Sequence, residues 1–236
     1  MNDIAGNLAA ALQGLRAACV GAGRPPDAAG LVAVSKGFPP AAIAAAAAAG
    51  QRSFGENYAQ EAQAKIEALA ALGLEWHFIG PVQSNKTREL ATRFAWVHGI
   101  DRLKIAERLS AQRPLDLPAL EVCVQVNVSG EASKSGCAPA EAADLCAAVA
   151  KLPRLRLRGL MTIPVAGTPE AARPAFRALR ELHRGIRAAG VVDRQAFDIL
   201  SMGMSADFEV AVEEGATLVR IGTAIFGRRE AGGGRR

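Results

Sequence analysis

The chain has 236 residues, of which 50% are hydrophobic and 22% are charged, and its formal net charge is +5. These proportions match ordinary globular proteins, so they exclude a wholly disordered chain and allow one large domain or two small ones. No stretch approaches about 18 consecutive strongly apolar residues, so we expect no membrane-spanning helix.

The positive charge gathers at the end of the chain. Four arginines and one glutamate give the last nine residues, 228–236, a charge of +3 and leave +2 of the total +5 for the rest. That remainder shows no basic stripe interleaved with aromatic side chains, so we expect no nucleic-acid partner. The N-terminus lacks the basic start of a secretion signal, and the four cysteines form no CxxC pair. We therefore predict a cytoplasmic protein with free, buried thiols and no zinc.

Short apolar runs alternate with longer helical patterns along the chain. The first pattern is an amphipathic helix over about residues 3–20. Eight runs are typical of strands: 31–35, 52–55, 75–80, 95–99, 120–128, 155–163, 196–203 and 217–222. Seven helical patterns lie between them: 39–50, 57–73, 84–94, 101–112, 139–152, 169–190 and 205–215. Several open with a residue that suits a helix start, among them Ser84, Pro169 and Ser205.

Strand–helix pairs of roughly 25 residues fill the chain once the first helix is set aside. This spacing predicts an α/β fold, a single (β/α)8 TIM-type barrel over residues 1–227 that is preceded by an extra N-terminal helix. Residues 228–236 are expected to form a flexible basic tail. The alternative is an open doubly wound sheet, but no GxGxxG follows the first strand, which weakens it.

In such a barrel the functional residues follow the strands. These positions carry no cluster of histidines and carboxylates, so no metal site is expected. They do carry Lys36, which ends the apolar run LVAVSK (31–36) and is one of only six lysines against 22 arginines. Desolvation at a barrel mouth would lower the pKa of this amine and make it a nucleophile for a carbonyl group. The plain alternative is a lysine that extends to water.

A second motif lies after the last two strands, where barrels commonly bind phosphate. LSMGMS (200–205) and RIGTAIFG (220–227) combine glycines, which permit close backbone approach, with hydroxyl groups, and Ser205 can cap a helix that faces an anion. Ordinary turn chemistry is the alternative. An aldehyde-binding lysine and a phosphate site together predict a ligand with an aldehyde and a phosphate, which describes pyridoxal 5′-phosphate (PLP).

On these residues the sequence resembles the pyridoxal phosphate homeostasis proteins, single-domain relatives of the alanine racemase barrel. The matching segments span almost the whole chain: LVAVSK (31–36), FGENYAQEAQAK (54–65), WHFIGPVQSNK (76–86), VQVNVSGEASKSG (124–136), LRGLMTIP (157–164) and LSMGMSADFEVAVEEGATLVRIGTAIFG (200–227). The resemblance implies that Lys36 holds PLP as a Schiff base, that Arg220 faces the pyridine nitrogen, and that Asn57 neighbours the ring. It also implies that the phosphate is surrounded by Ser201, Gly203, Ser205, Gly222 and Thr223.

Family members are regarded as cofactor-handling proteins without a settled reaction. We therefore expect a PLP-binding protein of intracellular vitamin B6 homeostasis, a monomer without catalytic residues that can deliver PLP transiently to apoenzymes. Two alternatives stay open: a PLP-dependent amino-acid racemase or decarboxylase, and a sugar-phosphate enzyme in which Lys36 forms a Schiff base with substrate. The racemase is disfavoured because Arg220 would oppose protonation of the ring nitrogen, and because we expect no tyrosine base from a second domain.

The three histidines and one further lysine receive plainer interpretations. His77 and His98 sit in or at the ends of apolar runs and are expected to be hydrogen-bonded core residues. His183 lies on an arginine-rich helix and is expected to be solvated. Lys134 can serve as a second, low-affinity anion or aldehyde contact, although a simple loop residue is the favoured interpretation.

Overall fold

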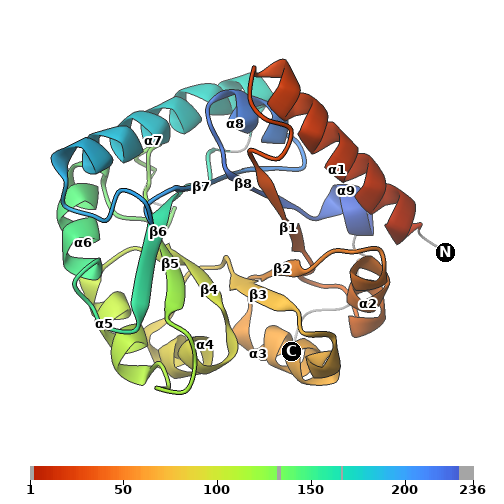
Figure 1. Cartoon of the computed structure of the whole chain (residues 1–236), viewed down its shortest axis with the longest axis horizontal. Coiled ribbons are helices and arrows are strands. Elements are labelled where there is room, and N and C mark those ends of the chain that lie inside the picture. Colours follow the sequence, from red (N-terminus) through yellow and green to blue (C-terminus); the bar gives the residue numbers. More distant parts are fainter. Residues whose placement is uncertain (1–2, 132–133, 166, 229–236) are drawn as a thin grey trace.

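The computed structural model describes residues 3–131, 134–165 and 167–228. Eight parallel strands follow one another around a closed barrel, and β1 pairs with β8 to complete it, which confirms the predicted fold (Figure 1). The strands are β1 (Gly30–Val34), β2 (Ser53–Glu56), β3 (Glu75–Phe78), β4 (Trp96–Ile100), β5 (Leu120–Gln125), β6 (Leu155–Met161), β7 (Ile199–Met204) and β8 (Leu218–Ile221).

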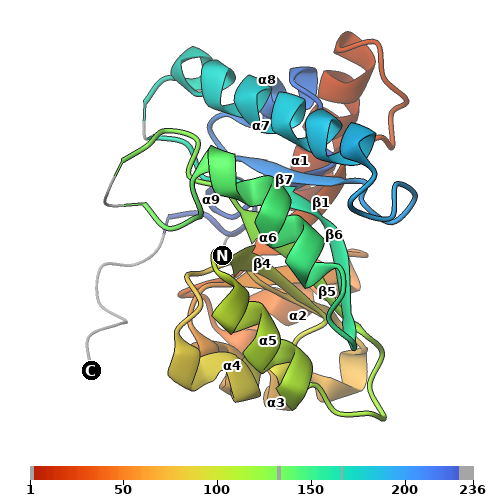
Figure 2. The same cartoon turned by 90° about the vertical axis from the view of Figure 1, so that its left-hand side faces the viewer.

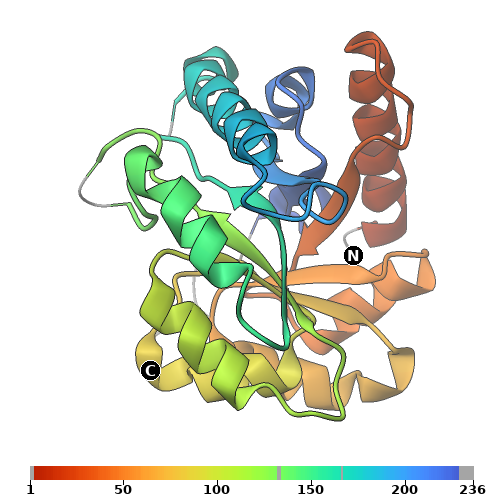
Figure 3. The same ribbon diagram turned by 60° about the vertical axis from the view of Figure 1, so that its left-hand side comes forward.

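Helices surround the strands in Figure 1, and α5, α6 and α7 all lie outside the sheet on the side shown in Figures 2 and 3. None of the described helices is long and apolar enough to span a bilayer. The α-helices are α1 (Ile4–Gly21), α2 (Pro40–Ala48), α3 (Ala59–Ala68), α4 (Thr87–Arg93), α5 (Leu103–Gln112), α6 (Ala142–Val149), α7 (Pro169–Ala189), α8 (Phe208–Glu213) and α9 (Thr223–Phe226). Three 3-10 turns complete the set: η1 (Ala70–Leu72), η2 (Ser84–Lys86) and η3 (Pro139–Glu141).

The extra N-terminal helix forms as predicted. Asp3 caps α1, because its side-chain oxygen accepts a hydrogen bond from the N–H of Gly6 at 2.9 Å. The helix lies beside α9 (Figure 1), and the side chain of Asn7 donates to the carbonyl of Ile225 at 3.0 Å. The first helix is therefore tied to the segment that follows the last strand.

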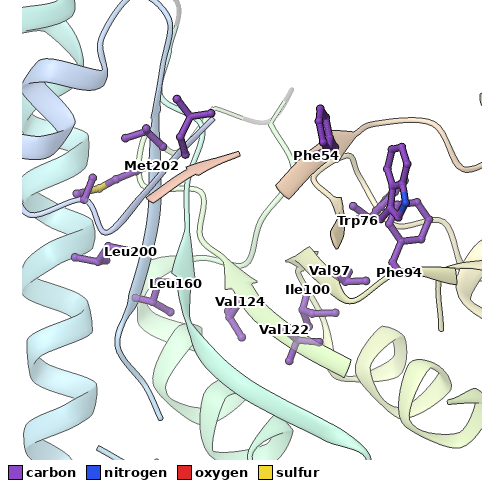
Figure 4. Packing of buried hydrophobic residues seen from close by; sticks show 14 of the residues in the cluster. Phe54, Trp76, Phe94, Val97, Ile100, Val122, Val124, Leu160, Leu200 and Met202 are labelled. Carbon is purple, nitrogen blue, oxygen red and sulfur yellow. The ribbon is translucent and has the colours of Figure 1, made fainter. Parts of the chain in front are cut away.

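The main hydrophobic core lies between the strands and the helices. Side chains alternate along a strand, so in β1 Leu31 and Ala33 join this core while Val32 points into the barrel. Figure 4 shows Phe54, Trp76 and Phe94 gathered in one part of this layer. The layer holds helices against every side of the barrel, and each buried apolar side chain of this size contributes roughly 1.5–3 kcal/mol.

The barrel interior differs from the branched apolar filling that is common in this fold. It contains a small apolar cluster of Trp96, Cys123 and Met161. Polar side chains share the interior with this cluster, and His77 and His98 are both almost fully buried there. A polar interior can persist only where its groups are hydrogen-bonded, so these bonds are central to the site.

Several local predictions are corrected. The first strand ends at Val34 rather than at residue 35, and the fifth ends at Gln125 rather than at residue 128. His183 is not solvated: it is buried and stacks on Phe197, with ring centroids 4.7 Å apart. The predicted boundary of the domain at residue 227 stays a prediction, and the predicted flexible tail falls on residues 228–236, of which only Arg228 is among the described residues.

Candidate functional site

The residues predicted to form the site come from four strands that are contiguous in the barrel. The pairing order β7–β8–β1–β2 makes these strands neighbours. Because all strands run parallel, their C-terminal ends meet at one end of the barrel. Lys36 follows β1, Asn57 follows β2, and the remaining candidates lie in or just after β7 and β8: Ser201, Gly203, Ser205, Arg220, Gly222 and Thr223.

Lys36 sits in a tight turn directly after β1. The N–H of Phe38 donates to the carbonyl of Ser35 at 3.1 Å, so Lys36 and Gly37 are the two central residues of a β-turn. Gly37 has φ +78°, a left-handed conformation that favours glycine. The lysine is half-buried at this point. The turn therefore presents the amine at the C-terminal end of the barrel from a defined backbone.

Arg220 is a buried cation in the neighbouring strand. Its Nη1 donates to the hydroxyl of Ser201 at 2.8 Å, and its Nη2 donates to the carbonyl of Thr162 at 2.9 Å. Only 3% of the residue is exposed, and burial lowers the pKa of Arg220 to about 10, an effect that the carboxylate of Asp207 partly opposes. The guanidinium group thus remains charged at neutral pH while both of these contacts are neutral acceptors.

A line of hydrogen bonds runs from Arg220 through the barrel interior. The Ser201 hydroxyl lies 2.8 Å from Nδ1 of His98, and Nε2 of His98 lies 3.0 Å from Nδ1 of His77. Nε2 of His77 lies 2.9 Å from a carboxylate oxygen of Glu75, which begins β3 at the opposite end of the barrel. The expectation that His77 and His98 are hydrogen-bonded core residues is therefore confirmed.

The charges at the two ends fix the direction of every bond in this line. The carboxylate of Glu75 can only accept, so His77 carries its proton on Nε2 and accepts at Nδ1. His98 then donates from Nε2 and accepts the Ser201 proton at Nδ1. Burial lowers the pKa of His77 and places that of His98 well below its usual value, so both imidazoles are neutral. The hydrogen bond from His77 also lowers the pKa of Glu75.

This arrangement gives Ser201 a role that the sequence did not indicate. Its hydroxyl is completely buried, donates its only proton to His98 and accepts from Arg220. A phosphate contact by this hydroxyl would require it to give up the bond to His98. Contact between Ser201 and a phosphate group therefore stays a prediction, whereas its contact with Arg220 is a feature of the fold.

The two candidate glycines are required by packing within the protein. A Cβ atom on Gly203, which has φ +93°, would lie 2.6 Å from the Cβ of Ala211. A Cβ atom on Gly222 would lie 2.9 Å from the carbonyl oxygen of Val34. Both distances are shorter than real Cβ contacts, so close approach of β7 to α8 and of β8 to β1 explains these glycines without a ligand.

Ser205 does not cap α8, which corrects the prediction made for it. The N-cap position belongs to Asp207, whose carboxylate accepts from the N–H of Met204 at 2.6 Å. The hydroxyl of Ser205 instead accepts from the N–H of Gly222 at 3.3 Å, and Thr223 begins the short helix α9. This bond brings the two motifs of the predicted phosphate site together.

Asn57 lines a cavity of about 200 Å³ at the same end of the barrel. The other lining residues are Ile79, Pro81, Gln125, Lys134, Ser135 and Ile163. The side-chain oxygen of Asn57 is buried and has no hydrogen-bond partner within the described ranges. An unpaired buried acceptor beside a cavity fits a ligand that donates a hydrogen bond, and the contact of Asn57 with the ring stays a prediction.

Four residues that matter to the site were not identified as such from the sequence. Glu75 starts an apolar strand, and His77 and His98 gave no sign that they share a line of bonds with Ser201. Lys65, which lies in the helix pattern of 57–73, is 4% exposed and contacts the carbonyl of Ser35 at 2.8 Å. Its place in the matching segment FGENYAQEAQAK and the scarcity of lysine in this chain were the available signals.

Side chains that could bind a metal ion were compared across the part of the chain that the structure describes. No group of three or more potential ligands among histidine, cysteine and the acidic residues comes together there. The four cysteines, Cys19, Cys123, Cys137 and Cys146, are free and buried.

Comparisons with known proteins point to one family. Residues 12–230 match the family described as "Alanine racemase, N-terminal domain". The pyridoxal phosphate homeostasis protein of Pseudomonas aeruginosa is 57% identical over 233 residues, covering 98% of each chain, and that of Escherichia coli K12 is 54% identical over 234 residues, also covering 98% of each. PipY of Synechococcus elongatus, solved with PLP bound, superposes with a TM-score of 0.80 at 37% identity, covering 95% of this chain and 100% of PipY.

The order of the strands, the lysine after β1 and the buried arginine in β8 thus occur in a sequence that matches these relatives over almost its whole length. The chain belongs to the alanine racemase N-terminal domain family and, within it, to the pyridoxal phosphate homeostasis proteins.

Proposed function

We propose that this chain binds PLP through Lys36 and serves intracellular PLP homeostasis, holding the cofactor as a Schiff base and releasing it to PLP-dependent apoenzymes by transient contact. The observation that carries the proposal is the pairing of β1 with β8. It sets the turn of Lys36 beside the strand of Arg220, and Val32 of β1 is in register with Arg220 itself. A nucleophilic amine and a buried cation therefore share one end of the barrel.

PLP supplies an aldehyde and, for bound amino acids, a ring that accepts electrons. Lys36 contributes the amine that condenses with the aldehyde and releases water. Arg220 donates hydrogen bonds as a permanent cation toward the ring nitrogen, and Asn57 offers its unpaired oxygen at the ring. Ser205, Gly222 and Thr223 bind the phosphate, together with the backbone around Ser201 and Gly203.

Poor amino-acid turnover is part of the proposal. A protonated pyridine nitrogen makes the PLP ring an effective electron sink, and a cation beside that nitrogen opposes its protonation. The pKa of Arg220 is about 10, so this side chain stays charged at pH 7. The protein accordingly handles the cofactor and carries no catalytic residue, acting as a cytoplasmic monomer with no nucleic-acid or membrane partner.

The first test is spectroscopic. Purified protein mixed with PLP should absorb near about 420 nm, as Schiff bases of PLP do, and borohydride should remove this band and leave a stable adduct. Peptide mapping should find the adduct on the peptide that contains VAVSK. An adduct on Lys134 or Lys151 in its place would refute the role of Lys36.

The second test separates a carrier from an enzyme. Racemisation of alanine and serine, decarboxylation of amino acids and α-hydrogen exchange in heavy water are measured with saturating PLP. We expect rates far below the enzyme median of about 10 s⁻¹, and turnover at that level would favour the racemase or decarboxylase alternative.

A further inference from the structure

A buried ion-pair cluster lies directly behind the turn that carries Lys36. Its centre is the ammonium group of Lys65 in α3, which contacts Glu56 at 2.7 Å and Glu61 at 2.6 Å. Glu56 ends β2 and is completely buried, and Glu61 precedes Lys65 by one helical turn. The third contact of the ammonium group is the carbonyl of Ser35 at 2.8 Å. An ammonium group has three N–H donors, so each one is used.

The cluster forms hydrogen bonds with the turn on both sides of Lys36. On one side, Ser35 accepts from Lys65 through its carbonyl and donates from its hydroxyl to Glu56 at 2.6 Å. On the other side, the N–H of Gly37 donates to Glu61 at 2.5 Å. Each neighbour of Lys36 is thus bonded to the cluster that these three charged side chains form.

These bonds have a direct consequence for a nucleophile. Condensation of a bound aldehyde with a lysine is fast and favourable only when the amine is held within reach of the carbonyl carbon. A turn fixed by charge-assisted hydrogen bonds restricts the backbone from which the Lys36 side chain extends. Without the cluster the turn would adopt more conformations, and the amine would spend less time in the productive one.

We propose that Lys65 is a positioning residue for Lys36: through Ser35, Glu56 and Glu61 it fixes the turn from which the Lys36 amine reaches the aldehyde of PLP. This inference rests on the proposed function, because it assigns Lys65 a part in the same condensation. The amine of Lys36 forms the C=N bond, and the aldehyde oxygen leaves as water. Lys65 takes no part in that exchange.

The experiment compares two ligands that differ only in their ability to condense. PLP carries the aldehyde, whereas pyridoxine 5′-phosphate carries an alcohol there and cannot form the bond. Affinities of the full-length protein for both are measured by fluorescence or calorimetry, and their ratio reports the covalent contribution. Lys36→Ala defines the ratio without that contribution.

Lys65→Met removes the ammonium group and keeps the length of the side chain. We expect its PLP affinity to fall on the order of 10- to 100-fold, with the affinity for pyridoxine 5′-phosphate within about twofold of the wild type. Lys104→Met, an exposed lysine of α5, is the matched control and should leave both affinities unchanged. Because removal of one partner from a buried ion pair can prevent folding, Glu61→Ala provides a milder second variant. It removes the acceptor of Gly37 and one of the three contacts of Lys65, leaves the contacts of Lys65 with Glu56 and Ser35, and should lower the same ratio by a smaller factor.

Three outcomes would overturn the inference. A parallel fall in both affinities would mean that Lys65 supports the fold of the site in general. A ratio equal to the wild type in both variants would mean that the turn is fixed without the cluster. If the wild-type protein itself bound both ligands equally, the proposed Schiff base would be wrong and the inference would fall with it, and the wild-type measurement alone identifies that case.

Discussion

The Nη1 atom of Arg220 lies 2.8 Å from the hydroxyl oxygen of Ser201, and this single bond joins the guanidinium group to the line of side chains that ends at Glu75. Ser201 connects Arg220 to His98, and neither of these residues can replace its hydroxyl group. Without it, Arg220 loses a buried acceptor and His98 loses the proton that satisfies Nδ1.

Ser201→Ala should therefore weaken PLP binding by about 1–3 kcal/mol, because a buried charged donor is left without its acceptor. Equilibrium titration with PLP measures the effect. Ser110→Ala is a matched control, since Ser110 is also buried but bonds the carbonyl of Pro153 away from the site. Equal affinities of the Ser201 variant and the wild type would show that the bond does not support the cofactor site.

The protonation of the two barrel histidines is a separate prediction, which needs no ligand. Nitrogen-15 spectra of the imidazoles should show His77 and His98 neutral and protonated on Nε2 between about pH 6 and 8. The reason is their burial between an anion and a cation, which leaves one consistent direction for the hydrogen bonds. Detection of a proton on Nδ1 of either ring would mean that the hydrogen bonds run in the opposite direction.

Gly203 should be much less tolerant of substitution than a glycine on the surface. Gly203→Ala would set a Cβ atom 2.6 Å from that of Ala211 in a left-handed conformation, so we expect a loss of about 1–3 kcal/mol in unfolding free energy. Gly185→Ala, in the exposed face of α7 with no atom within 4 Å, should gain about 0.4–1 kcal/mol. Urea unfolding of both variants gives the comparison, and a neutral Gly203→Ala would refute the packing explanation.

The burial of His183 predicts that the free energy of unfolding depends on pH. Burial lowers the pKa of His183 to about 4 from the ordinary 6.5. The folded state therefore binds the proton less readily than the unfolded state. The contribution of His183 to the unfolding free energy is fully present above about pH 6.5. It falls as the pH drops from there toward 4, and about 2 kcal/mol is lost at pH 5.

His183→Phe should preserve the stacking on Phe197 and remove this contribution. The loss of unfolding free energy between pH 7 and pH 5 should then shrink by about 2 kcal/mol relative to the wild type. His77 and His98 remain in both proteins, so their contribution cancels in the comparison. An unchanged difference would mean that His183 is protonated in the folded protein without cost.

Much of the fold could be predicted because it depends on local pattern. Apolar runs separated by amphipathic segments predict all eight strands and their order, and the first helix begins beside Asp3 as its pattern indicates. The ends of strands were less predictable: the run VNV follows Gln125 in the sequence, but β5 ends at Gln125 and Val126 forms an isolated bridge with Cys137. Pairing with the neighbouring strand decides where a strand ends, and the sequence of one strand does not contain that information.

The residues of the site likewise include some that the sequence could identify and some that it could not. Lys36 could be identified because a lysine after a buried strand is unusual in a chain rich in arginine. Lys65 could not, because in a helical pattern a lysine normally faces water, and only the fold brings Glu56 and Ser35 to it. The expectation of a solvated His183 fails for the same reason, since Phe197 comes to it from another segment.

The pairing of β1 with β8 also governs when the binding site comes into being. Lys36 follows β1 and Arg220 lies in β8, so the two residues come from the two strands of this pair, one near the beginning of the chain and the other near its end. A nascent polypeptide cannot assemble the pair until its last strand has left the ribosome and docked, and such long-range pairing is the slow part of folding. A ligand that contacts both strands would stabilise the closed barrel, because it binds the closed barrel and not the open one. Cofactor supply and successful maturation of the protein would then be coupled.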